Sequence, residues 1–181
     1  MTSAPSQSAD VVVVGAGAAG LMAALFAQRA GARTLLLERT PDGGRKILIS
    51  GGGRCNILPE KVQPERFVTD SSPNLLKKML RIWPLPEQIA FFERELGMPL
   101  VLGSETGKYF PESNQARDVR DGLLVRYREA GGAVRFQSTL CGLRPDNPGW
   151  VLETSEGVSV PARTVILATG GIGRAYKITS N

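Results

Sequence analysis

Three glycines near the start of the chain, Gly15, Gly17 and Gly20, have the spacing GxGxxG. Between a strand and a helix this pattern suits a diphosphate, because the first glycine makes a tight turn, the second lets phosphates approach the backbone and the third lets the helix pack on the strand. The helix start adds free N–H groups and about half a unit of positive charge. Glu38 would accept hydrogen bonds from an adenosine ribose and disfavour a 2′-phosphate. We therefore expect a dinucleotide site, with a purely structural glycine turn as the alternative.

A second glycine-rich stretch, GRKILISGGGRCN, covers residues 44–56 and contains Gly51, Gly52 and Gly53 in a row. Bare backbone of this kind costs conformational entropy and leaves room for a flat ring. Lys46 and Arg54 would place positive charge near that ring, which favours the reduced anion of a flavin. The alternative is a flexible surface loop with solvated cations.

The sequence offers few residues that could act as a catalytic nucleophile or base. Cys55 could form a thiolate beside Arg54, but no partner cysteine or base accompanies it, and Cys141 is expected to be a packed small residue. The cysteines form no CxxC pair, which argues against a zinc or dithiol centre and favours a reducing, cytoplasmic location. The sequence contains 0 histidines, which excludes a Ser-His-Asp triad, an HExxH zinc site and a histidyl-linked cofactor.

Composition points to a globular protein with a small-molecule partner. The 181 residues include 22 Lys and Arg against 17 Asp and Glu, giving a net charge of +5. These charges are scattered and form no basic stripe with interleaved aromatics, so we expect no nucleic-acid partner. The uncharged stretch 11–27 is short for a membrane span and is broken by glycines, so a buried strand and helix are expected in its place. The first ten residues do not resemble a secretory signal.

Periodicity predicts a strand, helix and strand around the GxGxxG turn, over residues 11–14, 18–30 and 33–38. A long loop is expected from Thr40 to Pro73. Beyond it the pattern predicts helices over 74–83 and 86–96, short strands within 98–110, a helix that begins after Ser113 or Asn114 and ends at Ala130, and strands over 133–138, 150–154, 158–162 and 164–168.

The order of these elements favours an α/β fold. We expect a Rossmann-like FAD-binding domain, with a parallel sheet and a β-meander before the return strand, plus a small helical insertion. The return strand opens into a further turn at Thr169 to Gly171, where backbone could again approach a ligand. The expected boundaries are a flexible N-terminus over 1–9, an FAD-binding domain over 10–56 and 113–181, and an insertion over 57–112 that forms part of a substrate or cap lobe.

Four motifs together resemble one family: GRKILISGGGRCN, GAGAAGL, KYFPESNQARDV at 108–119 and VILATGG. They are similar to those of the BaiN/YhiN-like flavoproteins, also called aminoacetone-oxidase-like. The resemblance implies an NAD(P)/FAD-dependent oxidoreductase with two dinucleotide-binding domains, about twice as long as this chain, so the chain looks like a fragment. It implies an FAD site made of Gly15, Ala16, Gly17, Ala19, Gly20, Glu38, Arg39, Lys46, Gly52, Gly53, Arg54, Cys55, Asn56, Leu140, Ala168, Thr169, Gly170 and Gly171.

Several functions stay open at this stage. The segment ATGGIGRAYKITSN resembles the flavoprotein subunits of succinate dehydrogenase and fumarate reductase, which usually attach FAD through a histidine that this chain lacks, so a non-covalent flavin is expected. A truncated flavoprotein without catalysis and an NAD-dependent dehydrogenase are further alternatives. The main expectation is an FAD-dependent oxidoreductase that transfers hydride at flavin N5, with NAD(P)H as a reductant and no identified catalytic acid or base.

Overall fold

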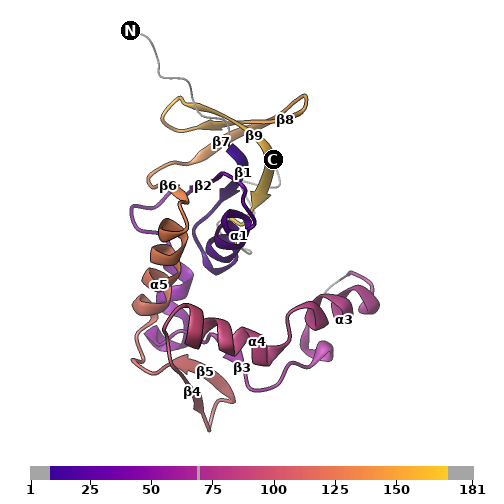
Figure 1. Cartoon of the computed structure of the whole chain (residues 1–181), viewed down its shortest axis with the longest axis vertical. Helices are drawn as coiled ribbons and strands as arrows, with labels where there is room; N and C mark the ends of the chain where they lie inside the picture. Colours follow the sequence, from indigo (N-terminus) through magenta and orange to yellow (C-terminus); the bar gives the residue numbers. More distant parts are fainter. Residues whose placement is uncertain (1–8, 69, 171–181) are drawn as a thin grey trace. The chain divides into compact units, whose positions relative to one another are not determined.

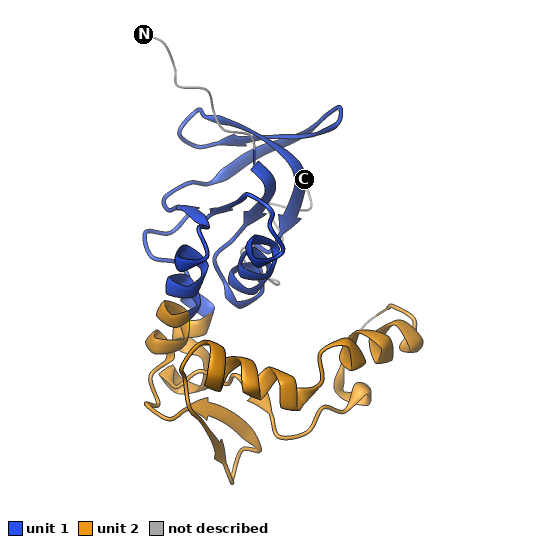
Figure 2. Cartoon of the chain, in the orientation of Figure 1, with its two compact units in different colours: residues 1–46, 123–181 blue, residues 47–122 orange. Residues whose placement is uncertain are grey.

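The computed structural model describes residues 9–68 and 70–170. The chain divides into unit 1, residues 1–46 with 123–181, and unit 2, residues 47–122 (Figure 2). Two helices, α2 (Arg45–Ile49) and α5 (Ala116–Glu129), carry the chain from one unit to the other. The segment 57–112, expected as an insertion, lies within unit 2.

Unit 1 begins with the predicted strand–helix–strand pattern. The strands β1 (Ala9–Val14) and β2 (Thr34–Leu37) are parallel and paired in register, and α1 (Ala18–Arg29) connects them. Val12, Val13 and Leu36 are fully buried, as expected for strands covered on both faces. These elements are confirmed, and the apolar stretch that contains them forms a strand and a helix.

Six strands form the sheet of unit 1 in the order β6-β2-β1-β9-β8-β7 (Figure 1). The first four are mutually parallel, and β8 and β7 complete an antiparallel meander with β9. Because β9 pairs with β8 along its first half and with β1 along its second, one strand joins the meander to the parallel core. The remaining bounds are β6 (Ala133–Arg135), β7 (Leu140–Asp146), β8 (Gly149–Thr154) and β9 (Ser159–Leu167).

The expected strand assignments in this region need two corrections. Residues 158–162 and 164–168 were expected as separate strands, but they form the single strand β9. The stretch 133–138 was expected to open the meander, but β6 pairs with β2 in the parallel part, and the meander opens with β7. The strand β7 was not predicted because it lies at the sheet edge, where most of its side chains are exposed and its sequence shows no alternation of apolar and polar residues.

The helix α5 is hydrogen-bonded to the sheet of unit 1 through a buried tyrosine. Tyr127 is fully buried, and its hydroxyl shares a hydrogen bond of 2.7 Å with Thr34 Oγ1 and donates to the Ala133 carbonyl at 3.0 Å. Burial raises the pKa of Tyr127. A Cβ on Gly132 would lie 2.0 Å from the tyrosine ring, so only glycine fits beside it. Four residues on one face of this helix are buried: Ala116, Val119, Leu123 and Tyr127.

Unit 2 combines short helices with a three-stranded sheet of order β3-β5-β4. The segment 41–73 was expected to be one long loop, but it contains α2, two 3₁₀ turns and a short strand, all too brief for a periodic signal. The helices expected over 74–83 and 86–96 and the strands expected within 98–110 are confirmed, and the second helix ends in a π-helical turn. The bounds are η1 (Ser50–Gly53), β3 (Leu58–Pro59), η2 (Pro64–Arg66), α3 (Pro73–Ile82), α4 (Leu85–Ala90), a π-helical turn η3 (Phe91–Glu95), β4 (Leu100–Gly103) and β5 (Lys108–Pro111).

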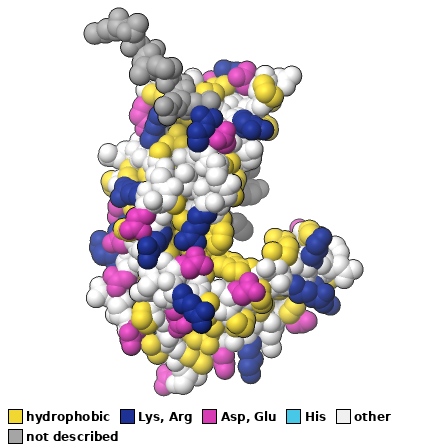
Figure 3. Space-filling view, in the orientation of Figure 1, with side chains coloured by type: hydrophobic (Ala, Val, Ile, Leu, Met, Phe, Trp, Pro, Cys, Tyr) yellow, Lys and Arg dark blue, Asp and Glu magenta, His cyan; other side chains and the backbone are white. Residues whose placement is uncertain are grey.

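The charged side chains are mixed in sign on the face drawn in Figure 3. Within the described ranges, no helix combines the length and apolar character needed to cross a membrane. The same residues contain no cluster of three or more Cys, Asp or Glu side chains that could hold a metal ion.

Candidate functional site

The glycine turn between β1 and α1 has two tightly packed glycines and one open one. A Cβ on Gly15 would lie 2.6 Å from the Ala168 carbonyl oxygen, and a Cβ on Gly20 would lie 1.8 Å from the Gly15 carbonyl oxygen. Gly15 also has a φ of +104°, which favours glycine. A Cβ on Gly17 would meet nothing within 4 Å, and the φ there is −79°. The fold therefore explains the glycines at 15 and 20 and leaves the one at 17 unexplained.

The start of α1 offers backbone donors beside Gly17. Gly17 is the N-cap residue and has no side chain to cap the helix, and its carbonyl accepts the first helical hydrogen bond, from Leu21 N–H at 2.9 Å. The N–H groups of the first turn consequently have no partner within the helix. The first turn also contains no acidic residue, so no side chain of the helix itself opposes the positive end of its dipole.

Glu38 is the buried acid at the end of β2, and 8% of its surface is exposed. One carboxylate oxygen, Oε2, accepts a hydrogen bond from Ala16 N–H at 2.7 Å, and Oε1 accepts from Thr40 N–H at 2.8 Å and from the Thr40 hydroxyl at 2.7 Å. Two carboxylate oxygens have about four lone-pair sites, so capacity remains for a ribose hydroxyl. Glu38 thus holds the glycine turn in place, and its carboxylate can still accept a hydrogen bond from the ribose of an adenosine.

A short strap after β2, residues 40–44, holds the glycine turn from a second side. Thr40 Oγ1 accepts from Gly43 N–H at 3.0 Å, and Gly44 N–H donates to the Ala16 carbonyl at 2.8 Å. A Cβ on Gly43 would lie 2.9 Å from Ala16 Cβ, and both glycines of the strap have φ near +70°. The strap was absent from the predicted site. The adjacent glycines at 43 and 44, shortly after the expected strand, were the signal that could have revealed it.

The end of β9 lies beside the glycine turn. Ala168 N–H donates to the Val14 carbonyl at 2.8 Å, and the backbone around Ala168 closely contacts Gly15. A Cβ on Gly170 would lie 3.0 Å from Lys46 Nζ, and Gly170 has a φ of +96°. Gly171 lies outside the described residues. Unit 1 therefore brings the first turn, the acid, the strap and the end of the return strand together.

Three further predicted residues of unit 1 contribute less to this arrangement. Ala19 is exposed in the first turn of α1, and Arg39 is exposed directly after Glu38. Leu140 lies on the edge strand β7, opposite Thr154, with its side chain packed against the core of the sheet.

The triple-glycine bend belongs to unit 2 and is largely braced by its own polar groups. All three glycines have positive φ, and a Cβ on Gly51 would lie 2.7 Å from Asn56 Oδ1. Asn56 N–H donates to Ser50 Oγ at 3.2 Å, and Arg54 Nε donates to the Gly51 carbonyl at 3.2 Å. A Cβ on Gly52 would again meet nothing within 4 Å. Gly52, Gly53, Arg54, Cys55 and Asn56 thus form a local cluster in unit 2, and their predicted contact with a flavin stays a prediction.

Arg54 and Cys55 do not form the activated thiolate considered from the sequence. The Arg54 guanidinium lies over the Phe110 ring, 4.4 Å from its centroid. Cys55 is buried in a backbone conformation with a φ of 65°. Burial raises the pKa of the Cys55 thiol, so the neutral thiol predominates at neutral pH. A reactive nucleophile needs the opposite environment. The expectation that Cys141 is a packed small residue is wrong, because Cys141 is exposed on the edge strand β7.

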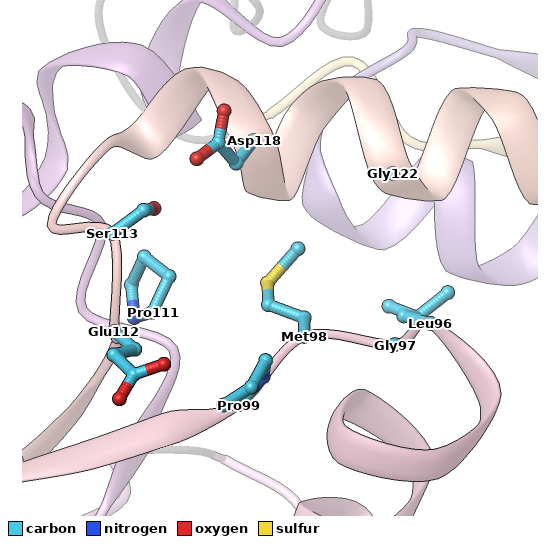
Figure 4. Close-up of a pocket in the computed structure, with 9 residues that line it drawn as sticks. All are labelled: Leu96, Gly97, Met98, Pro99, Pro111, Glu112, Ser113, Asp118 and Gly122. Atoms are coloured by element: carbon cyan, nitrogen blue, oxygen red, sulfur yellow. The ribbon is translucent and has the colours of Figure 1, made fainter.

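Unit 2 also contains a shallow pocket of about 330 Å³ (Figure 4). Met98 extends into it from the chain before β4, and Asp118 faces it from α5. Its polar lining includes Glu112 and Asp118, whose negative charges disfavour a diphosphate-bearing ligand. The anion-binding features described above belong to unit 1, whereas the residues that line this pocket belong to unit 2.

Comparison with known proteins identifies a family and a set of longer relatives. Residues 9–177 match the family described as the HI0933-like protein Rossmann domain. The chain is 29% identical over 171 residues to the ribosomal RNA dihydrouridine synthase of Escherichia coli, covering 90% of this chain and 40% of that protein. It is 34% identical over 176 residues to the protein of the same name from Haemophilus influenzae, covering 92% of this chain and 41% of that protein. The chain thus spans about two fifths of the length of these relatives.

A solved structure supports the fold. The 3-ketosteroid-Δ4-(5α)-dehydrogenase of Rhodococcus jostii RHA1 matches 91% of this chain and 46% of its own, with a TM-score of 0.62 and 20% sequence identity. At this identity the match concerns architecture alone. Together with the family match, it confirms the predicted Rossmann-like FAD-binding fold. The chain belongs to the HI0933-like Rossmann-domain family.

Proposed function

We propose that this member of the HI0933-like family binds FAD non-covalently and acts as part of an FAD-dependent oxidoreductase. The ADP half of the cofactor would lie along the glycine turn of unit 1. N–H groups at the start of α1 would donate to the diphosphate, and Glu38 would accept hydrogen bonds from the adenosine ribose. Bound FAD would supply hydride transfer at N5, while the chain supplies position and charge.

The open glycine at position 17 carries this proposal. A turn with only a structural role would need glycine at 15 and 20, where a Cβ would meet backbone at 2.6 and 1.8 Å. It would not need glycine at 17, where φ is −79° and the space above the Cα is open. A glycine there costs conformational entropy without a packing benefit. Close approach of a ligand to this backbone explains it.

The reductant and the substrate are further parts of the proposal. We propose NADH or NADPH as the reductant, and, from the resemblance to the BaiN/YhiN-like flavoproteins, a small molecule such as an amine as substrate. The names of the two relatives favour a second candidate, reduction of uridine in ribosomal RNA. In that case the expectation of no nucleic-acid partner would be wrong. A dicarboxylate substrate, as in fumarate reductases, is the runner-up from the sequence.

The cofactor proposal is tested by titrating the purified chain with FAD and recording flavin absorbance, fluorescence and the dissociation constant. We expect Gly17→Val to weaken FAD binding by more than about tenfold, or 1.4 kcal/mol, because the new side chain would occupy the phosphate path. We expect this variant to fold, because the Cβ position at Gly17 is open, with no atom beyond its chain neighbours within 4 Å.

The matched control is Gly20→Ala, whose Cβ would lie 1.8 Å from a backbone oxygen and should lower the midpoint of urea unfolding. A wild-type protein that stays colourless with added FAD would end the proposal. So would a Gly17→Val variant that binds FAD like wild type. Binding of NADH without FAD would support an NAD-dependent dehydrogenase in its place.

Substrate candidates are separated with the FAD-loaded protein. Anaerobic bleaching of the flavin by NADH or NADPH would support the proposed reductant. Oxygen-dependent turnover of aminoacetone would favour the amine oxidase candidate, and formation of dihydrouridine in a ribosomal RNA transcript would favour the RNA candidate. A protein that binds FAD but shows none of these activities would support a non-catalytic flavoprotein fragment.

A further inference from the structure

Lys46, in the first turn of α2, places its ammonium beside the turn at the end of β9. Gly44 N–H is fixed to the Ala16 carbonyl at 2.8 Å, and Lys46 follows two residues later. Its Nζ lies 3.0 Å from the position that a Cβ on Gly170 would take, and its Cε lies 3.6 Å from that position. Lys46 therefore reaches from the start of α2, next to the strap, to the turn at the end of β9. Both contacts lie within unit 1.

Ala16 makes backbone hydrogen bonds to the Glu38 carboxylate and to Gly44, which lies two residues before Lys46. Its N–H donates to the Glu38 carboxylate at 2.7 Å, and its carbonyl accepts from Gly44, the residue that leads to Lys46. The ion pairs found within residues 9–68 and 70–170 do not involve Lys46, so its charge is not neutralised by a bound carboxylate there. Glu38 thus places a negative charge where the ribose would lie, and Lys46 places a positive charge beside the turn after β9.

We infer that Lys46 is a positioning residue for the diphosphate of the cofactor. This inference rests on the proposed function and assigns the lysine a different partner from the one expected from sequence, which was the flavin ring. The ammonium and the N–H groups of α1 would attract the diphosphate, while Glu38 repels phosphate and accepts ribose hydroxyls. The two charges together would set the direction in which the adenine dinucleotide lies along the turn.

The test measures binding of adenosine, AMP and ADP to the full chain by calorimetry. We expect Lys46→Gln to weaken ADP binding about tenfold at low ionic strength, as for loss of one charge-assisted hydrogen bond, and to leave adenosine binding unchanged. The loss should shrink in high salt, because salt screens exposed charges. Lys46→Arg should restore most of the affinity for ADP.

The matched control is Arg45→Gln, which removes the adjacent exposed cation of α2 and should change ADP affinity by less than about twofold. Equal ADP binding by wild type and Lys46→Gln would overturn the inference. An equal loss in Arg45→Gln, or an equal loss of adenosine binding in Lys46→Gln, would overturn it as well, since the effect would then be general. If wild type binds no adenine nucleotide, the proposed function itself fails, which is a distinct result.

Discussion

Replacement of Glu38 by glutamine tests whether the buried acid supports the glycine turn. In the structure its two oxygens each accept a backbone N–H, from Ala16 at 2.7 Å and from Thr40 at 2.8 Å. A glutamine side chain has one oxygen and one NH₂ group, so in either orientation its NH₂ faces one of these N–H donors. At least one charge-assisted hydrogen bond from a backbone N–H is lost, and those that remain, among them the one from the Thr40 hydroxyl, become neutral or are lost as well.

A hydrogen bond to a charged group contributes about 1.5–3 kcal/mol, so we expect Glu38→Gln to lower the free energy of unfolding of unit 1 by about that amount. Urea unfolding followed by circular dichroism measures this loss, and hydrogen exchange should show faster exchange of the Ala16 or Thr40 amide. The control is Glu153→Gln on the meander, where the carboxylate is 57% exposed and 3.8 Å from Arg144, and where a change below about 0.5 kcal/mol is expected. A Glu38→Gln variant as stable as this control would refute the bracing role.

Two further predictions concern groups outside the glycine turn. Cys55 is buried and Cys141 is exposed, so a thiol reagent at neutral pH should modify Cys141 rapidly and Cys55 only in denaturant; rapid native modification of both would contradict the burial of Cys55. Hydrogen bonds from the Arg33 side chain lower the pKa of Asp10 to about 2, so the stabilisation from this pair is complete above the usual Asp pKa near 3.9 and lost as pH falls toward 2. The stability difference between wild type and Asp10→Asn, measured from pH 5 to 2, should narrow over that window, and a constant difference would exclude the pair as its source.

The sequence was sufficient for the core of unit 1 because that core depends on local signals. A β-branched apolar run, three glycines at fixed spacing and an apolar helix specify β1, the turn and α1 without reference to distant residues. The apolar positions of α5 were predictable for the same reason. Glu38 could be chosen because an acid at the end of the second strand has a definite position in this fold.

The parts that could not be predicted depend on pairing between distant segments. The edge strand β7 has mostly exposed side chains, so its register comes from β8 and not from its own pattern. The strap at 40–44 is fixed by single hydrogen bonds to Ala16 and Glu38 across the turn, which no local periodicity encodes. Arg54 was expected beside a ring of a cofactor, but no local pattern indicates that Phe110, far along the chain, lies under its guanidinium.

The central claim, that the glycine turn of unit 1 binds an adenine dinucleotide, is tested most directly by nuclear magnetic resonance of the ¹⁵N-labelled chain during titration with ADP. The account predicts saturable shifts of the amide signals of residues 15–20 and 40–46. Shifts confined to the unit 2 pocket near Met98 and Asp118, or no shifts at all, would contradict it.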